Sequence, residues 1–342
     1  MRAAPLYRVA QWVVSVPDGA ARDAGTIVPV AKEEAVEATG ELARRASIIV
    51  CTVDRRPDLE RCLESLRMFQ AAGAEIVVVN NGPHPVAVEA IARGFDAKAI
   101  TEPRRGVSRA RNAGIRAATG AILAFLDDDS VADPNWIPLL LAPFGDPQVL
   151  AVVGSIWAQT LADPVSRAFD HLHRAQFPES QLTLEAPPEK NPFPLRPALV
   201  GNANMAIRRE AFERFGFFDE RFGRGTRIGS GEEPDLLLAL LRGGGKIVVE
   251  PAARIFHRHS TARRAVRRWA FHSGCAHTAI LAKYFFQEPS LRGEVLCYAA
   301  SRVLRRQAAH ESRGGARVAP PQLPFLLGSL YGPLAFLLSG RK

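Results

Sequence analysis

Three consecutive carboxylates, Asp127-Asp128-Asp129, follow the short apolar run Ala121–Leu126. A run of this length and composition predicts a buried β-strand, so the acids are expected at its carboxyl end. Three carboxylates in a partly desolvated place repel one another. A divalent cation relieves that repulsion, and oxygen ligands suit Mg²⁺ or Mn²⁺. We therefore predict a metal site at this strand end, with a solvated acidic turn as the alternative.

Two arginines and an asparagine lie just before that strand, in a segment predicted to be a helix over Val107–Ala118. They are Arg109, Arg111 and Asn112. Helix N-termini and arginine side chains both favour phosphate. The segment is therefore a candidate phosphate site, and arginines on the surface of an ordinary helix are the alternative.

The elements that must position these residues alternate between strand and helix. Strands are predicted at Ser47–Thr52, Glu75–Val79, Ala97–Thr101, Ala121–Leu126, Val149–Ile156, Asn204–Arg208, Lys246–Val249 and Ile255–His257. Further helices are predicted from Pro57 and at Val86–Arg93, Pro134–Phe144, Arg209–Phe215 and Glu232–Arg242. This alternation predicts an α/β fold with a mainly parallel sheet. Ligands bind at the carboxyl ends of such strands, so Asp54, Asn80 and Asp127 are expected to line one crevice.

The net charge of +9 is distributed unevenly along the 342 residues. Residues 260–342 contain 13 Lys+Arg and 3 Asp+Glu, a net charge of +10, which leaves a net charge of −1 for residues 1–259. This distribution weakens the hypothesis that the whole protein binds polyanions. No recognised nucleic-acid-binding module accompanies the basic region, so we expect no nucleic-acid partner.

Cysteine usage and the N-terminus favour a reducing, cytoplasmic location. The four cysteines are too few and too scattered for a disulfide framework or a zinc finger. The apolar run Val9–Val16 is too short for a signal peptide and contains Gln11 and Ser15. No apolar stretch is long enough for an unambiguous transmembrane helix.

The C-terminal region combines a basic helix with a short apolar tail. A helix is predicted over 261–287, and its basic face consists of Arg263, Arg264, Arg267 and Arg268. The tail, Leu323–Leu338, is expected to be broken by Pro324, Gly328, Gly332 and Pro333. The combination predicts peripheral contact with anionic lipid at the cytoplasmic face of a membrane. Ordinary helices packed on the body, with a solvated arginine face, are the alternative.

Three regions result from these patterns. They are an N-terminal extension (1–45), an α/β domain (46–260) and the basic helical region (261–342). Residues 178–198 contain six prolines and are expected to form a long loop.

Five segments of the α/β domain, in this order, resemble family 2 of the inverting, GT-A-type glycosyltransferases. They are ASIIVCTVDRRPDLERCLESL (46–66), EIVVVNNGP (75–83), EPRRGVSRARNAGIRAATGAILAFLDDD (102–129), LVGNANMAIRREAFERFGFFDERFG (199–223) and GSGEEPDLLLALLRGGGKIVVEPAARIFHRH (229–259). The resemblance implies a GT-A-like, Rossmann-type mixed sheet flanked by helices, with a C-terminal helical extension. It also implies metal-dependent, inverting transfer of a hexosyl or deoxyhexosyl group from a nucleotide-diphosphate sugar to an acceptor hydroxyl.

The resemblance implies roles on the donor side of the site. Thr52, Asp54 and Arg55 would cradle the nucleotide, and Asn80 stands where an acid commonly reads the base. Arg111 and Asn112 belong to the family's A-R-N element. Asp127, with Asp128 beside it, would contact ribose or base, and Asp129 would hold the metal together with Asp127. His257 would be a further metal ligand, unless it only caps its strand.

The resemblance also places the catalytic base. The family uses an E-D pair at a helix start after a Gly-rich loop, and this chain has Gly231-Glu232-Glu233-Pro234-Asp235. Glu233 stands where aspartate is usual, and glutamate is a competent base. Glu232 and Asp235 remain rivals. Acids also favour helix N-termini for electrostatic reasons alone, which is the alternative account of all three.

The acceptor is expected to be a lipid-linked or cell-envelope glycan, which suits a membrane-facing tail. Asn204 could border the sugar or the acceptor, although asparagine is also common turn material. Two other functions stay open. A sugar-phosphate nucleotidyltransferase would need a Gly-rich, Lys-bearing phosphate loop after the first strand, and none is visible. A non-catalytic sugar-binding or scaffold protein of the same fold is compatible with the departures at Asn80 and Glu233.

Overall fold

The computed structural model describes residues 6–9, 12–15, 43–53, 56–174, 177–185, 204–300 and 322–340. Asp54, Arg55, most of the N-terminal extension and most of the predicted 178–198 loop lie outside the described residues. Strands β1 (Leu6–Val9) and β2 (Trp12–Ser15) form a separate antiparallel pair.

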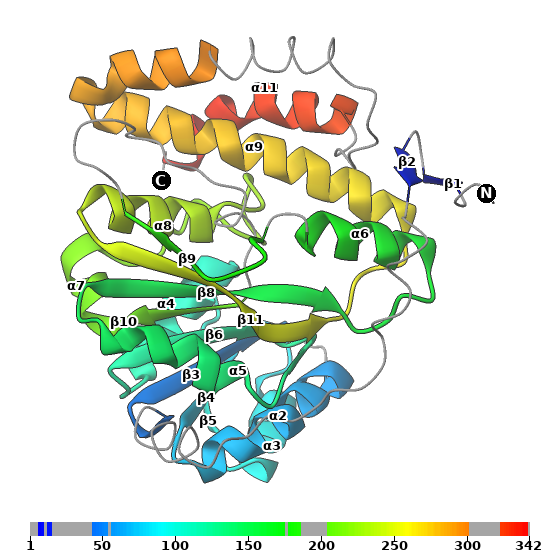
Figure 1. Ribbon diagram of the computed structural model, residues 1–342, viewed down its shortest axis with the longest axis vertical. Helices are drawn as coiled ribbons and strands as arrows, with labels where there is room; N and C mark the ends of the chain where they lie inside the picture. The colour runs from blue at the N-terminus through cyan, green and yellow to red at the C-terminus, as the bar shows by residue number, and fades with distance from the viewer. Residues whose placement is uncertain are drawn as a thin grey trace.

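A nine-stranded mixed sheet forms the centre of the described chain (Figure 1). Its strands are β3 (Ala46–Thr52), β4 (Glu75–Asn80), β5 (Lys98–Thr101), β6 (Ile122–Asp127), β7 (Ser130–Ala132), β8 (Val149–Ala158), β9 (Leu182–Leu184), β10 (Met205–Arg208) and β11 (Lys246–His257). The order is β5-β4-β3-β6-β10-β8-β11-β7, and β9 pairs with β11. The longest pairings, β3 with β4, β3 with β6 and β8 with β11, are parallel. The predicted mixed, mainly parallel sheet is confirmed.

Helices cover both faces of the sheet, where they bury apolar stripes against it, and the two C-terminal helices pack outside this layer. They are α2 (Arg56–Ala71), α3 (Pro85–Gly94), α4 (Val107–Ala117), α5 (Trp136–Leu141), α6 (Pro164–Arg174), α7 (Arg209–Phe215), α8 (Glu232–Arg242), α9 (Arg263–Gln287) and α11 (Gln322–Ser339). The short 3₁₀ turns η1 (Ala142–Gly145) and η3 (Pro289–Leu291) follow α5 and α9. Leu63 of α2 and Trp136 of α5 belong to one core cluster. Ile115 of α4, Phe212 of α7 and Leu237 of α8 belong to the other.

The register of the parallel strands brings their carboxyl ends to one edge of the sheet. Thr52 lies opposite Asn80, and Cys51 lies opposite Asp127. Asn80 and Asp127, which were predicted to line one crevice, are therefore the last residues of β4 and β6, the two strands on either side of β3.

Several elements of the described chain were not predicted, among them β1 and β2, and two predicted strands form a single one. Strands β7 and β9 and helix α6 lie in segments read as connections. Residues 246–257 form one strand rather than two. Pro251 has no N–H for the ladder, so the pairing with β8 shifts register between Glu250 and Arg254 and then resumes.

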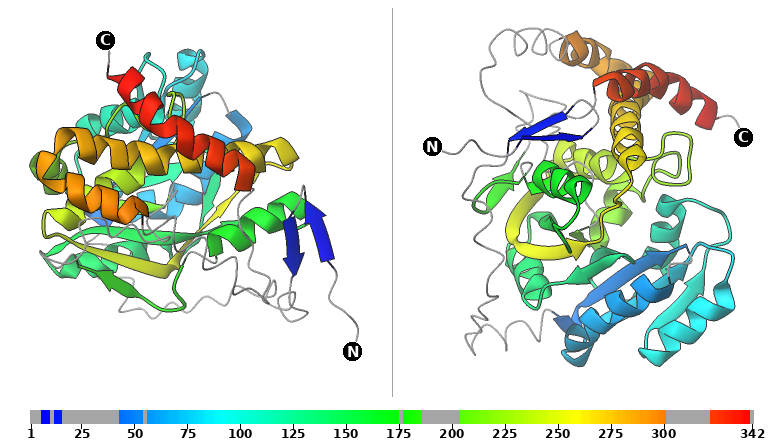
Figure 2. Two further views of the ribbon diagram at one scale, coloured as in Figure 1. Left: turned by 90° about the horizontal axis from the view of Figure 1, so that it is seen from above. Right: turned by 90° about the vertical axis from the view of Figure 1, so that its right-hand side faces the viewer.

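The C-terminal helices α9 and α11 pack on each other and over α8, on the side away from the sheet (Figures 1 and 2). The expected break in the apolar tail is wrong, because α11 is one continuous helix. Its glycines allow close contact: a Cβ on Gly328 would lie 1.9 Å from the carbonyl oxygen of Phe271 on α9. A Cβ on Gly332 would lie 2.1 Å from the hydroxyl of Thr278. By length and composition α11 could cross a membrane, and 22% of it is buried.

Candidate active site

Two carboxylates and one imidazole meet at the carboxyl edge of the sheet. Asp127 ends β6, Asp129 precedes β7 and His257 ends β11, and one ligand atom from each lies within 4.8 Å of the others. The Nε2 atom of His257 is 3.1 Å from Oδ1 of Asp129. The unpredicted β7 explains the meeting, because β11 pairs with β7 and sets His257 opposite Ser130. Oxygen donors with one imidazole fit a divalent cation such as Mn²⁺.

The His257 ring is held from behind by a second histidine. Its Nδ1 lies 3.2 Å from Nδ1 of His259, whose ring stacks on Phe169 at a centroid distance of 5.4 Å. Burial, with the neighbouring His257 and His173, lowers the pKa of His259 to about 2, so that ring is neutral. Such a contact fixes which nitrogen of a ligand histidine faces the cation.

The predicted nucleotide-binding residues of β3 and β6 are joined directly. The hydroxyl of Thr52 donates a 2.6 Å hydrogen bond to Oδ2 of the buried Asp128. Asn80 is buried at the end of β4, where its side-chain amide bonds the backbone of Gly82. Thr52, Asp127 and Asp128 thus lie together, while Asn80 also shapes the turn that follows its strand.

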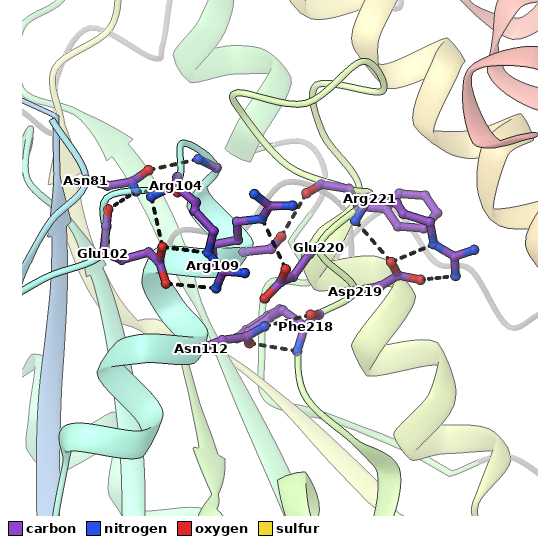
Figure 3. Close-up of polar contacts among 12 residues, drawn as sticks. Asn81, Glu102, Arg104, Arg109, Asn112, Phe218, Asp219, Glu220 and Arg221 are labelled. Carbon is purple, nitrogen blue, oxygen red and sulfur yellow. Dashed lines mark hydrogen bonds and ion pairs between the residues drawn. The ribbon is translucent and has the colours of Figure 1, made fainter. Parts of the chain in front are cut away.

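Asn81, which the sequence analysis did not single out, holds the loop before α4 (Figure 3). Its Nδ2 donates to the carbonyl oxygens of Glu102 and Arg104, at 2.7 and 2.9 Å. Its Oδ1 accepts a 2.9 Å hydrogen bond from the N–H of Gly106, the N-cap of α4. The only signal in the sequence is its place in the Asn-Asn-Gly turn.

Two asparagines proposed for the donor site face the interior. The side chain of Asn112 bonds both the N–H and the carbonyl of Phe218, at 3.0 and 2.9 Å (Figure 3). Asn204 accepts from the indole of Trp136 and donates to the carbonyls of Ser155 and Ala253. Both of its N–H donors and its side-chain oxygen bond to groups inside the protein, so this placement does not support a sugar contact.

The acids at the start of α8 surround one arginine. Gly231, the N-cap, adopts a left-handed φ of 98°, which favours glycine, and Glu232 and Glu233 follow it in the first turn. The Nη1 atom of Arg111 lies 2.8 Å from Glu233 and 3.1 Å from Glu232, and all three side chains are buried. Its Nη2 atom lies 3.6 Å from Asp127. Arg111 therefore joins the strand-end cluster to the predicted base.

Burial and the charges in this group shift the pKa values of Arg111 and Glu233. Burial, with repulsion from Glu232, raises the pKa of Glu233 to about 8, although Arg111 works in the opposite direction. Burial also opposes the charge of Arg111, but Glu233, Glu232 and Asp127 outweigh it and raise the pKa of the guanidinium. Asp235, the third predicted acid, lies apart from this group and binds Lys283 of α9 at 2.6 Å.

The sequence matches the family described as glycosyl transferase family 2 over residues 47–216. Succinoglycan biosynthesis protein ExoM of Rhizobium meliloti is 30% identical over 247 residues, which cover 68% of this chain and 74% of that protein. The chain belongs to glycosyl transferase family 2.

Other known proteins agree with this family assignment. The pre-mycofactocin glycosyltransferase of Mycobacterium tuberculosis is 30% identical over 247 residues, covering 70% of this chain and 48% of that protein. The match thus spans about half the length of that relative. A crystal structure of a mycobacterial protein shares the fold, with a TM-score of 0.51 and 18% identity over 75% of this chain and 79% of that one.

The site has three parts whose chemistry is relevant to sugar transfer. The strand-end cluster offers cation ligands, the Thr52–Asp128 pair offers fixed polar groups, and the start of α8 offers a carboxylate with a raised pKa. Sugar transfer to a hydroxyl needs stabilisation of the leaving group and removal of a proton. Arg111 lies between two of these parts, because it contacts Asp127 of the strand-end cluster and Glu233 of α8.

Proposed function

We propose that this glycosyltransferase transfers a sugar, with inversion, from a nucleoside diphosphate sugar to an acceptor hydroxyl. The observation that carries the proposal is Arg111, whose two terminal nitrogens reach Asp127 on one side and Glu233 on the other. The donor diphosphate and the acceptor hydroxyl would then meet within the reach of one side chain.

The donor side would be formed by the strand ends. Asp129, Asp127 and His257 would hold Mn²⁺ or Mg²⁺, which when bound stabilises the negative charge of the departing diphosphate. Asp128, oriented by Thr52, and the partly buried Asp127 would contact ribose or base. Asn80 would lie at the base, where it can both donate and accept hydrogen bonds.

The acceptor side would be formed by the start of α8. Glu233 would take the proton of the acceptor hydroxyl as the sugar is transferred. A buried carboxylate whose pKa is raised to about 8 holds that proton more firmly than an ordinary glutamate does. Arg111 keeps Glu233 directed towards Asp127, and therefore towards the donor.

An acceptor in cell-envelope or lipid-linked glycan synthesis is part of the proposal. A relative named for succinoglycan biosynthesis supports it, and so does the outer face of α11. Seven leucines are exposed there: Leu323, Leu326, Leu327, Leu330, Leu334, Leu337 and Leu338. Arg264, Arg267 and Arg268 of α9 are exposed as well. Apolar and basic side chains together favour the interface of an anionic membrane, here at its cytoplasmic face.

The activity is tested by incubating the full chain with nucleoside diphosphate sugars and Mn²⁺. We expect release of a nucleoside diphosphate and a product of inverted anomeric configuration by NMR, both lost with EDTA. Release of pyrophosphate would instead indicate a nucleotidyltransferase. Failure to bind any nucleotide sugar, measured by thermal shift, would indicate a non-catalytic protein.

The membrane contact is tested by sedimentation with vesicles that contain phosphatidylserine. Leu330 and Val86 are both 79% exposed, on α11 and on α3, so Leu330→Glu and Val86→Glu form a matched pair. We expect Leu330→Glu to weaken binding and Val86→Glu to leave it unchanged. Equal binding of both variants, or binding that does not depend on the anionic lipid, would overturn the proposed contact.

A further inference from the structure

The start of α8 is held from two sides by residues far away in the sequence. Arg111 of α4 forms ion pairs with Glu232 and Glu233. On the opposite side, Nζ of Lys283 lies 2.6 Å from Oδ2 of Asp235 and 3.1 Å from Oδ2 of Asp219. Lys283 belongs to α9, outside the segment that matches the family.

The Lys283–Asp235 pair is an ion pair in the interior. Asp235 is 3% exposed, and a buried carboxylate is costly unless a cation pairs with it. Burial works against the charge of Lys283, but Asp235 and Asp219 outweigh it and raise the pKa of the ammonium group. Asp219 has a second cation, because Arg221 bonds both of its carboxylate oxygens. Removing Lys283 would therefore leave the buried Asp235 without its nearest counter-charge.

Lys283 sets the position of the loop before α8 relative to the helix itself. Asp219 lies in that loop, and Asp235 lies in the first turn of the helix. The same loop packs on the acids, since a Cβ on Gly223 would be 3.2 Å from Cδ of Glu232. A shift of the loop against the helix would thus be transmitted to Glu232 and its neighbour Glu233.

The outer helix supports this contact from behind. The guanidinium of Arg221 lies 4.4 Å from the ring centroid of Phe336 on α11. Phe336 also packs on the ring of Phe222 at 6.3 Å. The C-terminal helices therefore pack directly on the loop that precedes the proposed acceptor side of the site.

We propose that Lys283 is a positioning residue for the acids of α8: by neutralising the buried Asp235 beside Asp219, it keeps the first turn of the helix, and with it Glu233, in place. Asp235 then has a structural role, which removes it as a rival for the base and makes α9 part of the catalytic unit. The inference rests on the proposed transfer reaction.

A double-substitution cycle tests the pair. We expect Lys283→Met to lower kcat about 10-fold or more. The KM for the donor should change less than about 3-fold, because the proposed donor contacts lie at the ends of the strands and not on α8 or α9. Lys283→Arg should retain most of kcat. Lys283→Met combined with Asp235→Asn should recover kcat to within about 3-fold of the parent protein, because no buried charge is then left alone.

Arg242→Met is the matched control. Arg242 also joins α8 to α9, through Glu288 at 2.6 and 2.9 Å, but at the far end of α8. We expect it to affect thermal stability without changing kcat. If Asp235→Asn alone abolished transfer and the double variant stayed inactive, Asp235 would be the base and the inference would be wrong.

Hydrogen exchange separates this inference from the transfer reaction. In Lys283→Met we expect faster exchange at the amides of residues 228–236, restored in the double variant and unchanged in Arg242→Met. This readout needs no substrate, so it decides the positioning role even if no donor is turned over. Unchanged exchange in Lys283→Met would overturn the inference on its own.

Discussion

The two acidic clusters on either side of Arg111 differ in what balances their charge. At the start of α8, Arg111 and Lys283 provide cations at 2.6 to 3.1 Å from three buried carboxylates. At the strand ends, Arg111 approaches Asp127 at the longer distance of 3.6 Å, and the partner of Asp129 at 3.1 Å is an imidazole. The first cluster is balanced by the protein's own side chains. The second presents ligand atoms that a divalent cation can share.

The largest expected effect is on the strand-end cluster. Asp129→Asn should lower transfer on the order of 1,000-fold, because the amide weakens the cation site that stabilises the leaving diphosphate. Mn²⁺ titration followed by electron paramagnetic resonance should show lost affinity. Glu64→Gln, an exposed change on α2, should leave both unchanged. Full activity of Asp129→Asn in EDTA would contradict the assignment of this cluster.

Glu233→Gln should distinguish the role of the acids of α8 from that of the strand-end acids. We expect kcat to fall about 100- to 1,000-fold, since general base catalysis contributes that much, while Mn²⁺ affinity stays unchanged. Glu232→Gln should lower kcat less than about 10-fold. Initial rates and Mn²⁺ titrations on both variants provide the comparison, and the reverse order of effects would move the base to Glu232.

Arg111→Met should show how strongly the α8 cluster depends on an internal cation. Removing one partner from a buried group of charges typically costs about 3–5 kcal/mol of unfolding free energy. Arg67→Met removes the exposed pair of Arg67 and Glu64, 2.8 Å apart, and should cost less than about 1 kcal/mol. Urea unfolding measures both, and similar losses would mean that the buried cluster is not held by Arg111.

The smallest expected effect is a shift in pH dependence. Burial and the charge of Glu232 raise the pKa of Glu233 to about 8, so transfer should rise with pH as Glu233 loses its proton. Glu232→Gln removes the like charge and favours the carboxylate form, so the profile should move to lower pH by about 1 unit. Arg111 and Asp127 stay in place in this variant. A profile that moved to higher pH would mean that Glu232 does not repel the base.

The strand ends could be predicted because their signals are local. The apolar runs that become β3, β4 and β6 are each followed by polar residues, and parallel pairing puts those ends on one edge. The helix predicted over Val107–Ala118 is α4, one residue shorter at its end. Thr52, Asp127 and Asp128 therefore lie together as expected. Their contacts with nucleotide remain predictions.

Contacts that join distant segments could not be predicted in this way. The three-residue strand β7 is too short to show the alternation of apolar and polar residues that predicts a strand. Its pairing with β11 nevertheless brings His257 to Asp129. Lys283 is 48 residues from Asp235, in a helix that matched no family segment. The sequence pattern predicts that the glycines of α11 break the helix. In the structure they allow α11 to pack closely on α9, and a local pattern contains no information about that neighbouring helix.

The sequence by itself determined the α/β class, the strand-end acids and the acids that open α8, since each depends on short-range period and composition. The tertiary structure alone decided how these acids are balanced. Electrostatic pairing depends on distance in space, and the partners Arg111, His257 and Lys283 reach their acids only through sheet pairing and helix packing.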